Sequence, residues 1–156
     1  MNRKNSITTV KVSLILLVIL GACSKNDDLS KVNYGTSFGM CLGYCRNELT
    51  LEPGYVTYVH SGWVDTVETI TCSDKLGNDD WVYYKTQLDV QEFLKLPATI
   101  GCPDCADGGA EWVEIELKNG TGHKVTFEWG NEPSVLNDYI IRLREQMDSS
   151  ILCNGD

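Results

Sequence analysis

The fold is decided by a stretch near the C-terminus, residues 111–129, which reads EWVEIELKNGTGHKVTFEW. Apolar and polar side chains alternate on both sides of a glycine-containing centre, a period of two that is typical of a half-buried β-hairpin. Aligning the apolar sets on one face places residue 117 opposite 123, 115 opposite 125 and 113 opposite 127, which requires a loop of three or five residues. The alternating apolar residues are Val113, Ile115, Leu117, Val125, Phe127 and Trp129.

A second hairpin is predicted upstream, about the turn Pro53-Gly54. Proline cannot adopt the positive φ of a tight type I′ turn, so we expect a four-residue loop. The segment from Trp63 to Cys72, rich in valine and threonine, is interpreted as a third strand. Pairing about the turn places four apolar side chains on one face, as the opposite pairs Leu51–Val56 and Leu49–Tyr58.

Helices are predicted before and after the 111–129 hairpin. Asn78, followed by two aspartates, is expected to cap a helix, and Asp89 to cap a further short turn. A longer helix is expected to begin near Asn131, with Pro133 in its first turn. The apolar faces consist of Trp81, Tyr84 and Leu88 in the first helix, and of Val135, Leu136, Tyr139, Ile140, Leu143 and Met147 in the last. We therefore expect an α+β fold: an antiparallel sheet built from hairpins, a C-terminal helix packed on it, a short helical segment in the middle, and disulfide staples.

The first 22 residues have the three-part form of a secretory signal. A basic start is followed by an apolar run at residues 12–20, and then Leu20-Gly21-Ala22-Cys23 resembles the lipobox of bacterial lipoproteins, whose cysteine is acylated. The apolar run falls far short of the ~20 residues of a membrane-spanning helix. We expect a signal peptide at residues 1–22 and a lipid on Cys23; an ordinary cleaved signal is the alternative.

A mostly polar segment separates Cys23 from the predicted domain. Residues 23–33 are interpreted as a flexible tether, and residues 34–153 as a single α+β domain. Residues 24–28, SKNDD, resemble the acidic signal that sends some Bacteroidota lipoproteins to the outer face of the outer membrane, and a solvated linker is an equal alternative. The expected location is the outer membrane, lipid-anchored on its periplasmic or cell-surface face.

Cysteine number and charge narrow the class of protein further. Seven cysteines are an odd count for an exported chain. The mature chain would keep ten basic and 22 acidic residues, a formal charge of −12, which disfavours nucleic acid and anionic lipid as partners. No cofactor is expected. Assigning Cys23 to the lipid leaves an even set for disulfides in an oxidising compartment: Cys41, Cys45, Cys72, Cys102, Cys105 and Cys153.

The most unusual passage is residues 100–112, IGCPDCADGGAEW. A redox interpretation takes Cys102 and Cys105 as a dithiol, but no helix follows the pair and the nearby aspartates would raise a thiol pKa. A zinc interpretation adds Cys41 and Cys45 to complete four sulfur ligands. A calcium variant would use the carboxylates of Asp104, Asp107 and Glu111. The favoured interpretation is structural disulfides, whose connectivity the sequence leaves open.

Two cysteine passages and the closing helix carry a family resemblance. Residues 37–45 (SFGMCLGYC), residues 102–112 and the predicted C-terminal helix together resemble a family of uncharacterised small Bacteroidota lipoproteins. The resemblance covers roughly residues 34–147. It implies an envelope location and an intact domain and supplies no catalytic residue. Cys153 lies outside it.

Few side chains suggest catalysis. His60 and His123 are not accompanied by a serine motif such as G-x-S-x-G, so both are interpreted as surface or half-buried imidazoles. Trp112 shares a strand face with Glu114 and is either covered by the cysteine loop, which we favour, or exposed as a contact for sugar or protein. Residues 65–67, DTV, resemble a short O-glycosylation tripeptide of the same phylum.

The sequence therefore predicts a cell-envelope lipoprotein that is a non-catalytic interaction or accessory module. Its expected partners are the membrane, through the lipid, and another envelope protein or a glycan. The alternative is a thiol-redox or metal-binding protein that uses Cys102 and Cys105.

Overall fold

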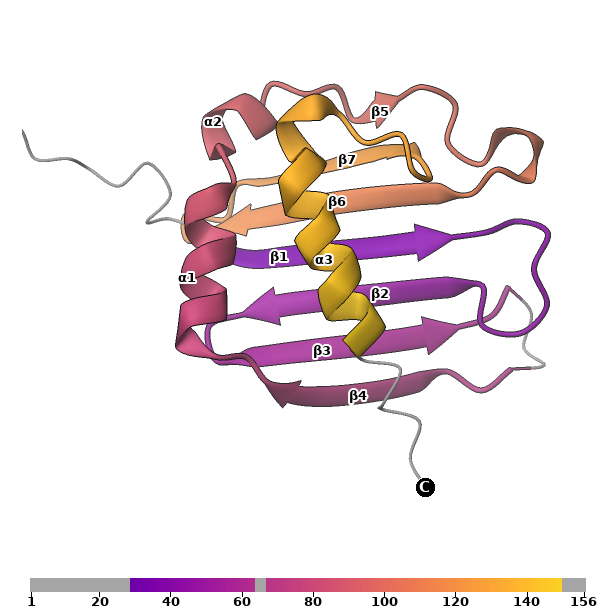
Figure 1. The fold of residues 1–156 in the computed structure, drawn as a ribbon, viewed down its shortest axis with the longest axis horizontal. Coiled ribbons are helices and arrows are strands. Elements are labelled where there is room, and N and C mark those ends of the chain that lie inside the picture. The colour runs from indigo at the N-terminus through magenta and orange to yellow at the C-terminus, as the bar shows by residue number, and fades with distance from the viewer. Residues whose placement is uncertain (1–28, 64–66, 150–156) are drawn as a thin grey trace, which may run out of the picture.

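The computed structural model describes residues 29–63 and 67–149, which form an α+β fold (Figure 1). Seven strands make one sheet in the order β4-β3-β2-β1-β6-β7-β5, antiparallel except where β5 lies parallel to β7. The strands are β1 (Leu29–Ser37), β2 (Arg46–Glu52), β3 (Tyr55–Ser61), β4 (Ile70–Lys75), β5 (Thr99–Ile100), β6 (Ala110–Leu117) and β7 (Gly122–Glu128). The helical elements are α1 (Asn78–Gln87), α2 (Val90–Phe93), η1 (Cys105–Asp107), η2 (Ser134–Leu136) and α3 (Asn137–Ser149).

The predicted tether, residues 23–33, overlaps the central strand β1 (Leu29–Ser37). Residues 29–33 belong to β1, which pairs with β2 on one side and β6 on the other, so the domain includes Leu29 rather than beginning at residue 34. Leu29 and Val32 are fully buried although they are three residues apart. A register irregularity between Leu29 and Lys31 accounts for this spacing, because an extra residue in a strand shifts the side chains that follow it to the other face.

The first hairpin confirms the predicted pairs. Leu51 lies opposite Val56 and Leu49 opposite Tyr58. The predicted four-residue loop is wrong, since Glu52 pairs directly with Tyr55 and Pro53-Gly54 alone forms the turn. Gly54 has a φ of 87°, so proline followed by a positive-φ glycine follows the type II pattern. The predicted third strand is present as β4, which begins only at Ile70.

The second hairpin has the predicted faces in a different register. Ile115 pairs with His123 and Val113 with Val125, two residues away from the predicted alignment. A shift of two residues keeps every side chain on its face, so the apolar sides of the strands still coincide. The odd loop length is confirmed, because five residues lie between the paired Glu116 and Gly122.

The helices α1, α2 and α3 lie on one side of the sheet. Figure 1 shows α1 and α3 crossing the same face, with α2 near the β7 edge. Asp89 caps α2 as predicted, accepting bonds from the amides of Gln91 and Glu92. Asn78 is instead the first residue of α1, and its N-cap is Gly77. The predicted C-terminal helix begins later than Asn131, first as η2 and then as α3. Val135 of its apolar stripe is exposed. The other residues of the stripe are buried: Leu136, Tyr139, Ile140, Leu143 and Met147.

No helix in the described parts of the chain is long and apolar enough to cross a membrane.

Candidate functional site

The connections that carry the unusual sequence passages meet at one end of the sheet. The 38–45 segment joins β1 to β2, the 101–109 segment joins β5 to β6, and residues 129–133 follow β7. Strand directions place these three segments, together with residues 62–63, at the right-hand end in Figure 1, and we call this the disulfide end. The opposite end contains the Pro53-Gly54 turn and the start of β1.

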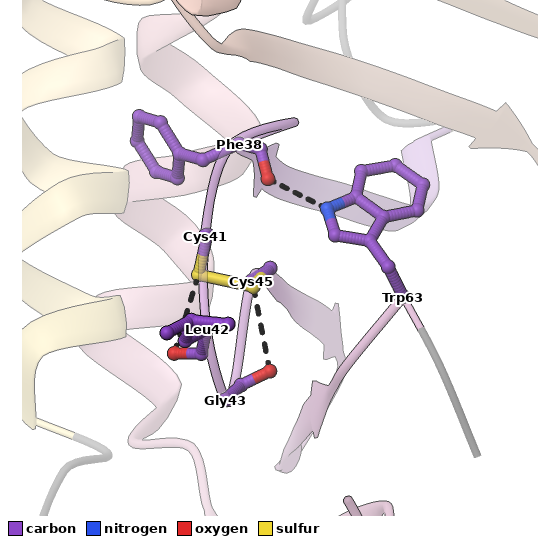
Figure 2. The surroundings of a disulfide bond; sticks show 6 residues. All are labelled: Phe38, Cys41, Leu42, Gly43, Cys45 and Trp63. Atoms are coloured by element: carbon purple, nitrogen blue, oxygen red, sulfur yellow. Dashed lines mark hydrogen bonds between the residues drawn. A yellow bond between two sulfur atoms is a disulfide. The ribbon is translucent and has the colours of Figure 1, made fainter. Parts of the chain in front are cut away.

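A disulfide joins Cys41 to Cys45 across the β1–β2 connection, with Cα atoms 5.5 Å apart. Beneath it the amide of Phe38 donates to the carbonyl of Cys45 at 3.0 Å, which closes the base of the loop. Figure 2 shows the indole of Trp63 donating to the Phe38 carbonyl at 2.6 Å, while the Phe38 ring points the other way. The loop therefore holds a fixed shape, and it presents three exposed side chains: Met40, Leu42 and Tyr44.

The second disulfide joins Cys102 to Cys105, whose Cα atoms are 5.4 Å apart. The loop includes three non-glycine residues with positive φ, Asp104, Ala106 and Asp107; aspartate adopts this conformation more readily than most residues. The side chain of Glu128 accepts a 2.8 Å bond from the Cys102 amide, and this bond is the main reason that the pKa of Glu128 lies below its ordinary value.

These two disulfides establish part of the cysteine connectivity that the sequence left open. Cys72 in β4 is also disulfide-bonded, whereas Cys23, Cys153 and residues 65–66 of the glycosylation tripeptide lie outside the described residues. Sulfurs paired within their own loops are not thiolate ligands, so the four-cysteine zinc set is not formed. Among the described residues no group of three His, Cys, Asp or Glu side chains is placed to hold a metal.

A buried ionic network lies behind the disulfide end, and it includes Glu111 of the calcium hypothesis. Glu111 on β6 is 0% exposed and accepts two bonds from Arg144 of α3, at 3.0 Å from Nε and 2.6 Å from Nη2. The hydroxyl of Tyr34 donates to the same carboxylate. Glu111 is thus directed into the helix-covered face and held there, while Asp104 and Asp107 are exposed on the loop.

Arg144 also binds a second carboxylate. Its Nη2 lies 2.8 Å from Oε2 of Glu132, and this hydrogen bond lowers the pKa of Glu132 below its ordinary value. Bonding to Glu111 and Glu132 outweighs burial and raises the pKa of the guanidinium. Burial, reinforced by the Glu111 charge, raises the pKa of Tyr34 as well. At neutral pH the network therefore contains a charged guanidinium that is bonded to two carboxylates, and a protonated tyrosine.

A cavity of about 340 Å³ lies between the sheet and α3, next to this network. Its volume is at the lower end of the range for small-molecule sites. The rings of Phe38 and Trp129 form one wall, edge to face with centroids 5.3 Å apart. The other lining residues are Tyr34, Thr36 and Asn47 from the sheet, and Arg144, Met147 and Asp148 from α3.

A second hollow, of about 280 Å³, also borders Trp129 and includes both cysteines of the CPDC loop among its lining residues. The hollow is bounded by Cys102, Cys105, Gly108, Gly109, Glu128 and Trp129. Trp129, which is 43% exposed, is thus shared by both depressions.

Trp112, the aromatic residue singled out in the sequence, is covered. It is 4% exposed and lies on the helix-free face of the sheet, over Gly35. The cover comes from cations: the Arg46 guanidinium carbon is 4.7 Å from the ring centroid and the Lys124 ammonium is 4.6 Å from it. The exposed aromatic residues of the disulfide end are Trp63, Trp129 and Tyr44 instead.

The two histidines form no acid–base pair within the described residues. His60 Nδ1 bonds Asn47 Oδ1 at 2.7 Å, and burial lowers the pKa of its ring. His123 Nε2 bonds the Leu96 carbonyl at 2.9 Å. Both partners are neutral amides, which do not supply the charge that activates a histidine base.

The buried pair of Glu111 and Arg144 was not predicted from the sequence, although the position of each residue carries a signal for it. Glu111, Val113 and Ile115 are two residues apart along the strand, so their side chains point to the same face. This spacing places a carboxylate on the apolar face. Arg144 lies four residues after Ile140 and three before Met147, on the apolar stripe of α3. Opposite charges at two core-facing positions indicate a buried pair.

No protein-family model matches the chain, and no curated protein matches it.

Proposed function

We propose that the protein is a lipid-anchored, non-catalytic interaction module of the cell envelope, acylated at Cys23, with the disulfide end as its contact surface. The lipobox-like LGAC run, the preceding apolar run and the six cysteines that remain after Cys23 support the anchor. The anchor belongs to the outer membrane on this proposal.

The observation that carries the proposal is the direction of β1. Its first residue, Leu29, follows Cys23 by six positions, and its last residue, Ser37, leads directly into the Cys41–Cys45 loop. Nine residues of strand span ~30 Å, and the five intervening residues reach at most ~18 Å. An acylated Cys23 would therefore keep the start of β1 near the lipid surface and direct the disulfide end away from it.

The disulfide end has the properties of a contact surface. Met40 and Leu42 are exposed on a loop closed by a covalent bond, with Tyr44, Trp63 and Trp129 also exposed at this end. Aromatic residues and methionine are enriched in protein interfaces. A loop that is already fixed loses little conformational freedom on binding, which favours affinity.

Mass spectrometry of protein extracted from its own membrane tests the proposal. We expect an N-terminal peptide that begins with an acylated Cys23, and we expect Cys23→Ser to release the protein from the membrane fraction. The matched control is Ser24→Ala, which should leave anchoring intact. An unmodified Cys23 in membrane-extracted protein would overturn the proposal.

A second candidate function is thiol–disulfide exchange at the CPDC loop. The observation in its favour is that Cys102 and Cys105 are both exposed and line a hollow. In that reaction a partner dithiol would be oxidised while the Cys102–Cys105 disulfide is reduced. The surrounding carboxylates of Asp104, Asp107 and Glu128 disfavour a thiolate, so we rank it second. Oxidation of a reduced dithiol peptide by the wild-type protein, abolished by Cys102→Ala, would reverse the ranking.

A further inference from the structure

We propose that the cavity between Phe38, Trp129 and α3 binds an alkylammonium group, as found at the end of a lysine side chain or in a free aliphatic diamine. The inference names the chemistry that the disulfide end recognises, and so it rests on the proposed contact function. It does not require the lipid on Cys23.

Among the described residues that line the cavity, Arg144 alone carries a positive charge. Arg144 uses Nε and Nη2 on Glu111 and uses Nη1 and Nη2 on Glu132. Its guanidinium carbon also lies 5.2 Å from the Trp129 ring centroid. With two carboxylates and a ring face as partners, Arg144 has little capacity left to attract an anionic ligand.

One of the residues that line the cavity carries a carboxylate. Asp148 lines the cavity, is exposed and forms no ion pair or hydrogen bond with another described residue. Three carboxylates, those of Glu111, Glu132 and Asp148, thus accompany one guanidinium, which gives the group a net charge of −2. The acidic chain as a whole adds to the negative potential that draws a cation toward this opening.

The cavity also has an apolar wall. Phe38, Trp129 and Met147 provide an apolar surface, and Figure 2 shows the Phe38 ring turned away from Trp63, toward α3. An aliphatic stem can pack against such a surface while its ammonium group meets the carboxylate and the aromatic rings. The hydroxyl of Thr36 and the amide nitrogen of Asn47 remain without a partner among the described residues and are available to a polar backbone or a water.

The test is a titration followed by the four indole N–H signals in a nitrogen–proton correlation spectrum. Trp129 lines the cavity, whereas Trp81 and Trp112 are buried elsewhere and Trp63 lies outside the lining. We expect n-pentylammonium to shift the Trp129 signal with a dissociation constant in the millimolar range. The neutral analogue 1-pentanol should bind at least ~5-fold more weakly, and pentanoate should cause no saturable shift.

Two variants on α3, each of which removes one negative charge, distinguish binding at the cavity from the effect of the overall negative charge. Asp148→Asn should weaken n-pentylammonium binding by about 10-fold. Glu145→Gln removes the same charge from an exposed position that pairs with Arg142, and it should change binding by less than ~2-fold. Equal effects of the two variants, equal binding of 1-pentanol, or preferential binding of pentanoate would overturn the proposal.

The source of the ammonium group is distinguished in a further arm with two probes. Nα-acetyl-lysine amide, whose ε-amino group is free, carries the ammonium group on a peptide backbone. 1,5-Diaminopentane carries the ammonium group as a free diamine. Tighter binding of the lysine derivative assigns the cavity to a protein partner, and tighter binding of the diamine assigns it to a small molecule. Failure of both, with Cys23 acylated in the membrane, would refute the cavity proposal and leave the anchored module standing.

Discussion

The indole of Trp112 lies directly over the backbone of Gly35, the residue paired with it on the neighbouring strand. A Cβ at position 35 would overlap the six-membered ring. Glycine is therefore required here by close approach rather than by its dihedral angles. The ring fills the space of the missing side chain, and two cations lie within 5 Å of the ring centroid: Arg46 at 4.7 Å and Lys124 at 4.6 Å.

Gly35→Ala should accordingly destabilise the fold by about 1–3 kcal/mol, the usual cost of overpacking, because Trp112 must leave its position. Urea unfolding followed by tryptophan fluorescence measures the change. The control is Gly39→Ala, where an added Cβ meets its nearest neighbours at an ordinary 3.6 Å. Equal effects of the two substitutions would contradict the assigned contact.

Removing the cation of the buried network should be costly. Arg144→Met leaves Glu111 fully buried with Tyr34 as its remaining side-chain donor, and an uncompensated buried charge costs about 3–5 kcal/mol. The double variant Glu111→Leu/Arg144→Met removes both charges and should recover at least half of the lost stability. A double-mutant cycle in urea measures the coupling, and additive effects would show that the two residues act independently.

Two buried tyrosines should respond to phenylalanine in opposite directions. The hydroxyl of Tyr139 is buried without a partner in the described structure, so Tyr139→Phe should leave stability unchanged or raise it by up to about 1 kcal/mol. The hydroxyl of Tyr34 donates to the Glu111 carboxylate, so Tyr34→Phe should cost about 1.5–3 kcal/mol. Thermal unfolding of both variants provides the comparison, and the opposite order would disprove it.

Stability should fall in acid partly through Glu132. The hydrogen bond from Arg144 holds the pKa of Glu132 below its ordinary value of 4.5 in the folded state. Its contribution is therefore complete above that value and is lost as the pH falls through the lowered folded pKa. The stability difference between wild type and Glu132→Gln should shrink between about pH 5 and pH 3. A difference that stays constant over this window would refute the linkage.

Non-reduced peptide mapping should recover two short disulfide loops, Cys41–Cys45 and Cys102–Cys105. Loops this short restrict the unfolded chain little, so replacing either pair with alanines should cost only about 2 kcal/mol. For Cys72 we predict Cys153 as the partner, since Cys23 is assigned to the lipid and the other cysteines are paired. Such a long loop should contribute about 4 kcal/mol. A bridge between the 41–45 and 102–105 loops would contradict the assignment.

Alternation and helical periodicity predicted most of the secondary structure, because each hairpin and α3 contain a regular apolar set. The central strand escaped prediction for a physical reason. Its bulge places Leu29 and Val32 three positions apart, which no period of two reproduces, and the polar residues between them resemble a linker. The predicted pairing of β6 with β7 was two residues away from the observed pairing. The apolar pattern fixes which residues share a face of the sheet, but it does not fix which residues lie opposite one another.

The candidate site was less accessible to sequence analysis than the fold. The cysteines and Trp112 drew attention because they are rare residue types, yet Trp112 proved to be covered. The cavity forms from Phe38, Trp129 and Asp148, which lie in three separate segments and share no motif. Their proximity depends on α3 crossing the sheet next to the disulfide end, and this crossing is set by packing rather than by any local pattern.

The central position of β1 has a mechanical consequence for a protein attached through its N-terminus. A ligand pulling on the disulfide end would load β1 along its axis, against β2 on one side and β6 on the other. Both ladders would then be strained in shear, where many bonds must break together, rather than peeled apart one rung at a time. A domain anchored at its N-terminus and bound to a ligand at the disulfide end would therefore resist traction between the two.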